Sequence, residues 1–503
     1  MPNNLMPQIK NIVFLMLENR SLDNLLGWLY EKSNPEHVFP LDSRKDYEGL
    51  QTGKYTNPEP NNPDQLVPVT KITDITWREI LSKQWGVPYY DPWEALRAYP
   101  NDPRQLYDNW QGVMNQFYGN SQIINGLPVT KNGQPPMKGF LQDYYSSEML
   151  AWKGRDILWT YEPEQLTTIN SLARSFAVSD RWFSSAPTET NPNRAYSLCG
   201  TSLGIEDNGP YKVTPPYQQY DTLTLFNQLT NQGKRWKLYY ADEWANKLSY
   251  TEYTFPQIPH GHSANLNTFY NDASAGTLPD FSYIEPHWTG LGTVGDDYHP
   301  PSFVLPSENF LRRVFTSLRS SPQWQNMLFI VTFDEHGGTY DHVQPPGTAI
   351  NPDGKTSENG FKFDQYGARV PTLLISPYIR KGTVFRSPCG LDQPFDHTSF
   401  IKTILLWAGM TKDEMNLGQR APSAPTFDGV LSDQRVNDTT DVGTASTPTG
   451  EAVALHPAGA NKELQALLVD VPGAATKSIL ATCKTKEEIV AAVADYRKGI
   501  KTS

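Results

Sequence analysis

The sequence predicts a large α/β protein in which a mostly parallel sheet is covered by helices. Two apolar runs, Ile12–Leu17 and Leu328–Phe333, have the length and composition of strands that are buried on both faces. Other short apolar runs alternate along the chain with segments of helical periodicity, which is the order typical of parallel sheets. A chain of 503 residues is long enough to bury a sizeable core around such a sheet.

The same patterns give the other elements. Four further strands are expected at Ser175–Ser179, Leu238–Tyr240, Phe281–Glu285 and Leu373–Ile379. Four helices are expected at Gln165–Arg174, Thr222–Gln232, Asn309–Arg319 and Ser399–Trp407. Residues of the helix-capping type precede the last three helices, namely Asp221, Ser307 and Asp396.

The chain divides into a main domain, a tether and an appendage. Residues 1–438 form the main domain, and residues 36–161 within it lack clean periodicity and are rich in Pro, Asn, Tyr and Trp. Irregular segments of this length are usually lids or binding walls, so we interpret 36–161 as an insertion. Residues 439–450 are rich in Thr, Gly, Ser and Pro and indicate a linker, and 451–503 is expected to be a small helical appendage.

Composition narrows the function class and leaves the location open. The net charge of -11, without a Lys/Arg stripe, argues against nucleic-acid binding. The N-terminus lacks the features of a signal peptide, and the first apolar run is too short to cross a bilayer. The localisation stays unknown: cytoplasmic, exported by a non-classical route, or extracytoplasmic if a signal was removed. Three cysteines do not make a disulfide framework, so the redox compartment is also undetermined.

Acidic residues follow both long apolar runs. Glu18 and Asn19 come directly after the first run, and Asp334 and Glu335 directly after the second. The carboxyl ends of parallel strands share one edge of a sheet, so these side chains are expected to meet. Three carboxylates together would repel one another without a cation, and oxygen ligands suit a hard divalent metal. We expect one ion, with Ca, Mg or Mn favoured by the ligand type and Zn still open.

A hydroxyl, an amide and a guanidinium occur within five residues in another segment. Thr190, Asn193 and Arg194 follow the expected strand 175–179 and could together meet a phosphoryl group. A threonine hydroxyl is a poor nucleophile unless its pKa is lowered, and coordination to the same ion would do this. Arg194 would then neutralise phosphoryl oxygens through a forked contact.

Histidines supply candidate proton donors, because a leaving alkoxide needs a proton near neutral pH. Of nine histidines, His299 and His342 are the best candidates by their position near the expected strand ends. The sequence does not assign roles to the remaining candidates, which are His260, His262, His287 and His397.

At this point the motifs resemble those of a known family. The matching blocks are Glu18–Asp23, Thr190–Arg194, Phe333–Val343 and Gly367–Pro371. In this order they are similar to the signature blocks of the bacterial and plant phosphoesterase family, which holds phosphatidylcholine-type and non-specific phospholipases C and acid phosphatase A.

The resemblance implies a core like that of alkaline phosphatases and sulfatases, and a phosphoesterase catalytic domain over residues 1–438. Carried over by position, Glu18, Asn19, Asp334 and Glu335 would hold the metal. Thr190 would be the nucleophile that forms a phosphothreonine, and His299 would assist. In the stretch 36–161 the chain departs from the family, which puts the substrate in doubt.

Three functions stay open. The first is a metal-dependent phosphoric ester hydrolase of the phospholipase C type, and the second is a non-specific acid phosphatase with the same site. The third is a catalytically silent, metal-stabilised binding protein. A phospholipid or a small phosphoester is the expected partner, with transient contact to a membrane surface and no transmembrane segment. Aromatic residues of the insertion could bind a quaternary ammonium headgroup or simply pack together. They are Trp85, Tyr89, Tyr90, Trp93, Trp110 and Tyr118.

Overall fold

A computed structural model of the chain describes most of the main domain. The described residues are 5–72, 110–119, 123–124, 127–128, 137–146, 155–208, 219–241, 249–288, 295–300, 304–439 and 442. The predicted appendage 451–503 lies outside them, as does the predicted linker 439–450 apart from residues 439 and 442.

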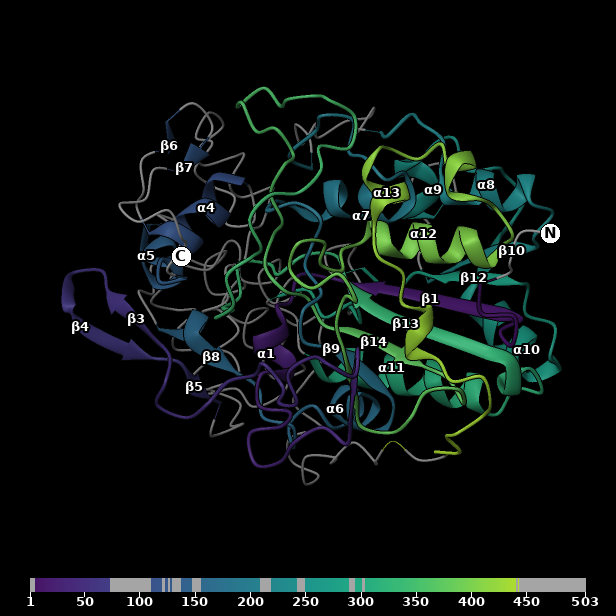
Figure 1. Cartoon of the computed structure of the whole chain (residues 1–503), viewed down its shortest axis with the longest axis horizontal. Coiled ribbons are helices and arrows are strands. Elements are labelled where there is room, and N and C mark those ends of the chain that lie inside the picture. Colours follow the sequence, from purple (N-terminus) through teal and green to yellow (C-terminus); the bar gives the residue numbers. More distant parts are fainter. Residues whose placement is uncertain are drawn as a thin grey trace, which may run out of the picture.

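A nine-stranded mixed sheet forms the centre of the molecule (Figure 1). Its order is β11-β10-β12-β1-β13-β14-β9-β15-β2. Every neighbouring pair is parallel except those of β14, which runs antiparallel to β13 and to β9. The strands are β1 (Asn11–Leu17), β2 (His37–Phe39), β9 (Ala177–Ser179), β10 (Trp236–Tyr240), β11 (Ser263–Asn265), β12 (Phe281–Ile284), β13 (Met327–Phe333), β14 (Thr372–Ile375) and β15 (Thr383–Phe385). The predicted mostly parallel sheet is confirmed, and each predicted strand is present.

The two long apolar runs are neighbours at the middle of this sheet. Every residue of β1 and of β13 is buried, as expected for strands covered on both faces. Their parallel register pairs Leu17 with Phe333, the last residue of each strand. Glu18 and Asp334 therefore leave the sheet side by side, at the carboxyl edge.

Helices cover both faces of the sheet, which confirms the α/β class (Figure 1). One face carries α6 (Thr167–Ser175), α10 (Leu266–Ala275) and α11 (Val304–Arg319). The other carries α7 (Thr190–Leu198), α8 (Leu225–Asn231), α9 (Tyr250–Thr254), α12 (Thr398–Trp407) and α13 (Arg420–Ser423). The short helix α1 (Leu22–Leu26) follows β1 directly. In the described residues, no helix combines the length and the apolar character needed to cross a membrane.

The predicted helix caps had mixed outcomes. The N-cap of α12 is His397, one residue after the predicted Asp396, but Asp396 Oδ1 still accepts the backbone N–H of Thr398 at 3.0 Å. Asp221 was the wrong residue for α8, whose N-cap is Thr224 in a capping box with Asn227. Ser307 lies inside α11, which begins earlier, at Val304. Ser307 instead accepts a hydrogen bond from the backbone of Tyr298, so tertiary contacts decided its role.

The predicted insertion 36–161 is partly integrated into the main sheet and partly a separate packing unit. Its first strand, β2, pairs with β15 at the sheet edge. The other described elements are β3 (Thr56–Glu59), β4 (Asn62–Pro68), β5 (Thr70–Lys71), α4 (Trp110–Tyr118), β6 (Ile123–Ile124), β7 (Leu127–Pro128), α5 (Phe140–Ser146) and β8 (Trp159–Thr160). α4 and α5 contribute to a second hydrophobic cluster that also includes Phe361 and Phe363. In Figure 1 this unit lies beyond the carboxyl ends of β1 and β13.

The aromatic residues proposed for headgroup binding are only partly described. Trp110 is buried and stacks on Phe361 with ring centroids 5.1 Å apart, so it packs the second cluster. Tyr118 is partly buried against the same cluster. The other four, Trp85, Tyr89, Tyr90 and Trp93, lie outside the described residues.

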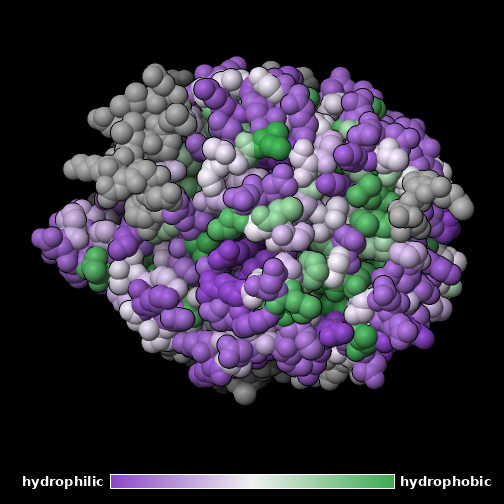
Figure 2. All heavy atoms as spheres, viewed as in Figure 1, coloured by the Kyte–Doolittle hydropathy of each residue, from purple (hydrophilic) through white to green (hydrophobic). Residues whose placement is uncertain are grey.

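The surface seen from the same side is mainly hydrophilic, with hydrophobic side chains in small, separated groups (Figure 2). Scattered apolar residues of this kind are normal on soluble domains. This face therefore gives no argument for a lipid or protein contact.

Candidate active site

The turn after β1 places an amide and a carboxylate at the sheet edge. Asn19 adopts a left-handed backbone conformation with φ of 56°, which asparagine tolerates better than most residues. Ser21 then caps α1 by accepting the N–H of Asn24. The chain thus reverses sharply just after Glu18 and Asn19, and both side chains stay near the strand end.

The turn after β13 fits against this first turn through a glycine. Gly337 has φ of 60°, and a Cβ at this position would clash with the carbonyl oxygen of Asn19. Only glycine supplies this backbone conformation without a side chain. The glycine after the acidic pair is therefore required by the close approach of the two turns.

Asp334 joins the two strand ends directly. Its Oδ1 accepts the backbone N–H of Asn19 at 3.0 Å and that of Glu335 at 2.8 Å. Glu335, also fully buried, accepts the N–H of Gly337. The structure therefore brings together the acidic strand ends that the sequence placed at one site.

Thr190 is the first residue of α7 and lies against Asn19. Its hydroxyl donates to Asn19 Oδ1 at 3.1 Å, and the side chain is only 7% exposed. The free N–H groups at a helix N-terminus favour negative charge nearby. A hydroxyl next to an acidic strand end, at the start of a helix, can act as a nucleophile toward an anionic group.

Arg194 lies one turn further along α7, between the two acidic strand ends. Its Nε is 3.1 Å from Asp334 Oδ2, and its Nη2 is 3.2 Å from Glu18 Oε1. The guanidinium stacks over Trp288 at 4.6 Å, and its Nη1 has no hydrogen-bond partner among the described residues. We call Glu18, Asp334 and Arg194 the Arg194 cluster.

Burial dominates the electrostatics of the Arg194 cluster. Desolvation raises the pKa of Glu18 well above its usual value, although Arg194 acts in the opposite direction. Desolvation also acts against the charge of Arg194, but Asp334 and Glu18 outweigh it and raise the pKa of the guanidinium. Arg194 therefore stays charged, and Glu18 would gain from a further cation.

The donor atoms at the acidic strand ends suit a hard divalent cation by their chemical type. Carboxylate oxygens of Glu18, Asp334 and Glu335 and the amide oxygen of Asn19 are of the type that Ca, Mg or Mn prefers. The raised pKa of the buried Glu18 points the same way, because a cation beside it would stabilise its ionised form.

His299 is the predicted histidine that reaches this site. Its Nε2 lies 4.0 Å from Glu18 Oε2, and its side chain is a quarter exposed. The segment is fixed from both sides: Glu18 donates its N–H to the carbonyl of Asp297, and His299 donates its own to Asp297 Oδ1. His299 is thus a histidine with access to both solvent and the acidic site.

Two other predicted residues have different surroundings. Asn193 binds the backbone of its own entry loop, accepting from Ala186 and donating to the carbonyls of Ala186, Thr188 and Glu189. This pattern fits a loop-stabilising role. His342 binds Asp23 rather than Glu18 or Asp334, with Nδ1 2.6 Å from Asp23 Oδ2.

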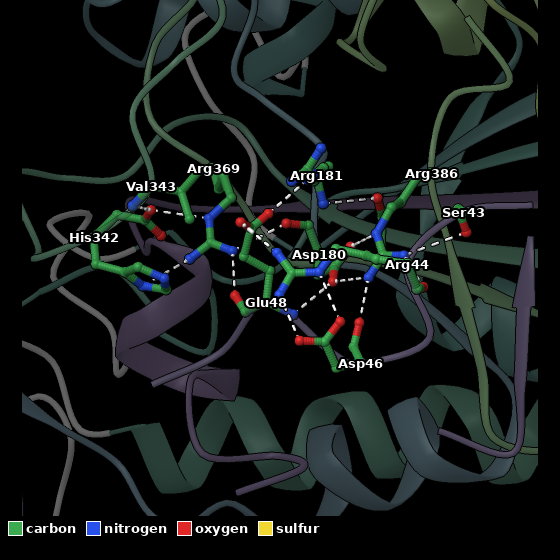
Figure 3. Close-up of polar contacts among 12 residues, drawn as sticks. Ser43, Arg44, Asp46, Glu48, Asp180, Arg181, His342, Val343, Arg369 and Arg386 are labelled. Carbon is green, nitrogen blue, oxygen red and sulfur yellow. Dashed lines mark hydrogen bonds and ion pairs between the residues drawn. The ribbon is translucent and has the colours of Figure 1, made fainter. Parts of the chain in front are cut away.

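His342 belongs to a second buried group, which we call the Arg369 cluster: Asp23, Asp341, His342 and Arg369. Figure 3 shows His342 beside Arg369. Ligand atoms of the two aspartates and the histidine all lie within 4.8 Å of one another, a spacing that could hold a metal ion. The guanidinium of Arg369, however, already pairs with Asp23 at 2.8 Å and with Asp341 at 2.9 Å. Its charge takes the place of an ion in this group.

Sequence reasoning missed two histidines that support the acidic turn. The sequence assigns no role to His397, yet its Nε2 lies 2.6 Å from the carbonyl oxygen of Asp334. His336 is buried, binds Gln116 of α4 at 2.7 Å, and burial lowers its pKa to about 3. The sequence signal for His397 is its position directly after Asp396, at the start of α12.

The fold and the site together define an α/β protein with a buried acidic centre and a hydroxyl at a helix N-terminus. Residues 9–407 match the model of the phosphoesterase family. The chain belongs to this family, whose members hydrolyse phosphoric ester bonds, and the resemblance seen in its motifs is confirmed.

Individual relatives agree with this membership. The chain is 33% identical over 409 residues to non-specific phospholipase C1 of Arabidopsis thaliana, covering 80% of this chain and 67% of the relative. It is 28% identical over 476 residues to phospholipase C A of Mycobacterium tuberculosis, covering 84% and 76%.

A solved structure of a protein in the alkaline phosphatase superfamily from Vibrio parahaemolyticus also matches. The identity is 15%, the coverage is 52% of this chain and 62% of that chain, and the TM-score is 0.29. At that score the fold class rests on the sheet topology described above.

Proposed function

We propose that this protein is a phospholipase C-type enzyme that cleaves phosphoric diesters, with Thr190 as the nucleophile. One observation carries the proposal: the Thr190 hydroxyl binds Asn19 at 3.1 Å, while the backbone N–H of Asn19 binds Asp334 at 3.0 Å. The Thr190 hydroxyl and both acidic strand ends therefore share one buried site, which supports Thr190 as the nucleophile. The names of the relatives support phospholipids as the substrate class.

The chemistry follows from the positions of the side chains. Thr190 Oγ1 loses its proton to water, attacks phosphorus and forms a phosphothreonine, while the P–O bond to the leaving alcohol breaks. The positive charge of Arg194 and the N-terminus of α7 favour the negative charge that develops on the phosphoryl oxygens. His299, the partly exposed histidine beside Glu18, gives a proton to the leaving oxygen. Water then attacks the phosphothreonine and restores the threonine.

We assign Glu18, Asn19, Asp334 and Glu335 as the residues that would hold one divalent cation. When bound, the cation would lower the pKa of a nearby hydroxyl and neutralise phosphoryl charge. Ca, Mg or Mn is favoured by the oxygen donors over Zn.

A non-specific acid phosphatase is the competing function, because monoester hydrolysis would use the same residues. The test compares a choline phospholipid with an aryl phosphate monoester, each with and without a chelator. We expect the diester to be hydrolysed with the higher kcat/KM, and chelation to abolish the rate. A preference for the monoester would instead favour the phosphatase, and no turnover of either would favour a silent binding protein.

Thr190 variants test the nucleophile on the same substrates. Thr190→Ala is expected to lower kcat by about 10³-fold or more, whereas Thr190→Ser keeps a hydroxyl and retains measurable turnover. Binding of Mn²⁺ alone, measured by calorimetry, is expected to survive in both variants. An alanine variant with the wild-type rate would remove Thr190 from the mechanism.

A further inference from the structure

Arg369 is buried between the turns that carry the active-site residues. It follows the sequence Gly367–Ala368 just before β14, and its side chain is fully buried. Its guanidinium donates to four groups other than His342, all at 3.0 Å or less. Such a planar fork can hold several acceptors in fixed directions at once.

Two of these contacts reach the turns that hold the acidic residues. Nη2 donates to Asp23 Oδ1 at 2.8 Å, and Asp23 is in α1, directly after the turn that carries Glu18 and Asn19. Nε donates to Asp341 Oδ1 at 2.9 Å, and Asp341 lies in the loop that begins with Asp334. The backbone carbonyl of Arg369 also accepts the N–H of Leu22 at 3.1 Å.

One further contact reaches the loop that leads to Thr190, and another reaches Glu48, which lies outside that loop. Nη1 donates to the carbonyl of Asp180 at 3.0 Å, at the end of β9, and to the carbonyl of Glu48 at 2.6 Å (Figure 3). Arg369 also forms an antiparallel bridge with Phe183 in the same loop. This loop runs from β9 to Thr190 at the start of α7.

His342 adds a further tie between the two acidic turns. Its backbone N–H and its Nδ1 both lie within 2.7 Å of Asp23 Oδ2. Asp23 therefore binds the arginine through one oxygen and the histidine through the other.

We propose that Arg369 is a positioning residue for the active site: one guanidinium fixes the relative placement of the turns after β1 and β13 and of the loop before Thr190. This inference rests on the proposed function, because it assigns the three segments the roles given above. A lysine in its place would keep the charge but present one nitrogen, which cannot reach acceptors on all three segments.

Arg386 is a matched control. It is also a buried arginine and binds a carboxylate with two nitrogens, Asp180 at 2.7 and 2.6 Å. Its other contacts are to Ser43 and to the carbonyls of Arg44 and Asp46 (Figure 3). None of its hydrogen bonds among the described residues reaches the turns that hold Glu18 or Asp334.

The experiment compares amide hydrogen exchange and kinetics in wild type, Arg369→Lys and Arg386→Lys. The reporting amides are those of Asn19 and Glu335, which both bind Asp334 Oδ1. In Arg369→Lys, the amides of Asn19 and Glu335 are expected to exchange about tenfold faster than in wild type. The same variant is expected to lower kcat by about 10²-fold with little change in KM. Arg386→Lys is expected to speed exchange at Glu48, whose N–H binds Asp180, and to leave Asn19 and Glu335 as in wild type.

Asp341→Asn serves as a second variant if Arg369→Lys does not fold, and is expected to show a smaller increase at the same amides. Wild-type exchange at Asn19 and Glu335 in the folded variant would overturn the proposal, as would equal increases in Arg386→Lys. Failure of the wild type to hydrolyse either ester would count against the proposed function alone, because the exchange measurement still decides the role of Arg369.

Discussion

The Arg194 cluster and the Arg369 cluster each pair a buried arginine with one acid from the segment after β1 and one from the segment after β13. The two clusters differ in how many nitrogens of the arginine already have hydrogen-bond partners. In the Arg194 cluster, the arginine pairs with Glu18 and Asp334, and its Nη1 has no hydrogen-bond partner among the described residues. In the Arg369 cluster, all three guanidinium nitrogens have partners.

The two clusters also differ in the side chains that surround them. The Arg194 cluster lies beside a hydroxyl and a partly exposed histidine, Thr190 and His299. The Arg369 cluster is saturated with protein partners, and both of its aspartates are fully buried. We propose that the Arg194 cluster meets the substrate and that the Arg369 cluster holds the turns in place. Proximity of acids and an arginine therefore does not by itself identify an active site.

The two clusters are expected to differ most in how much kcat falls when one acid charge is removed from each. Asp334→Asn is expected to lower kcat by about 10³-fold, because it affects the reacting site itself. Asp341→Asn is expected to lower kcat by about tenfold, through displacement of the turns alone. Breaking a buried ion pair costs up to about 3–5 kcal/mol, so both variants should lose unfolding free energy. Steady-state kinetics measures the loss of kcat, and urea unfolding measures the loss of unfolding free energy. An equal loss of kcat in the two variants would contradict the different roles of the two clusters.

The approach of the two turns can be tested at Gly337. Gly337→Ala adds a side chain at positive φ and against the Asn19 carbonyl, so both stability and kcat should fall. Gly354→Ala is the control, since Gly354 also has positive φ but has no atom within 4 Å of an added Cβ. The control should lose only about 1–2 kcal/mol for the backbone conformation and keep its kcat. Similar kinetics in the two variants would show that the contact with Asn19 is unimportant.

Glu308 is a buried acid outside both clusters, without an arginine partner in its hydrogen bonds, and its effect can be measured through the pH dependence of stability. Glu308 of α11 accepts the hydroxyl of Tyr298 and the N–H groups of Thr168 and Ile169, and burial raises its pKa to about 7. The folded protein thus holds this proton more tightly than the unfolded chain. The associated stability is present below the usual pKa of 4.5 and is lost as the pH rises through about 7.

Between pH 4.5 and about 7, the unfolding free energy is expected to fall by about 1.4 kcal/mol per pH unit, or about 3 kcal/mol in all. Glu308→Gln removes the ionisation, so the difference in unfolding free energy between variant and wild type should change by this amount between pH 4.5 and 8. A difference that stays constant with pH would mean that Glu308 has an ordinary pKa.

Sequence reasoning predicted the sheet and the acidic edge because both depend on local pattern. The apolar runs of β1 and β13 and the residues that follow them are enough to place Glu18 and Asp334 together once the strands are parallel neighbours. Thr190 and His299 required the resemblance as well, because a lone threonine or histidine in a loop has no periodic signal.

The remaining roles depend on which contacts each side chain makes in the folded chain. Asn193 has the same residue type whether it binds phosphate or its own loop, and only its contacts with Ala186 and Thr188 decide. The sequence likewise could not show that His342 pairs with Asp23, or that His397 supports the carbonyl of Asp334. The first pairing spans 319 residues and the second spans 63, so neither leaves a local spacing to detect.

The most direct test of the Thr190 mechanism is to trap the covalent intermediate. The wild-type protein is mixed with a choline phospholipid, quenched in acid during the first turnover and digested, and the peptide that contains Thr190 is analysed by mass spectrometry. The account predicts one added phosphoryl group on Thr190, absent from Thr190→Ala and from protein without substrate. Rapid hydrolysis with an unmodified Thr190 peptide at every quench time, or with the phosphoryl group on another residue, would contradict it.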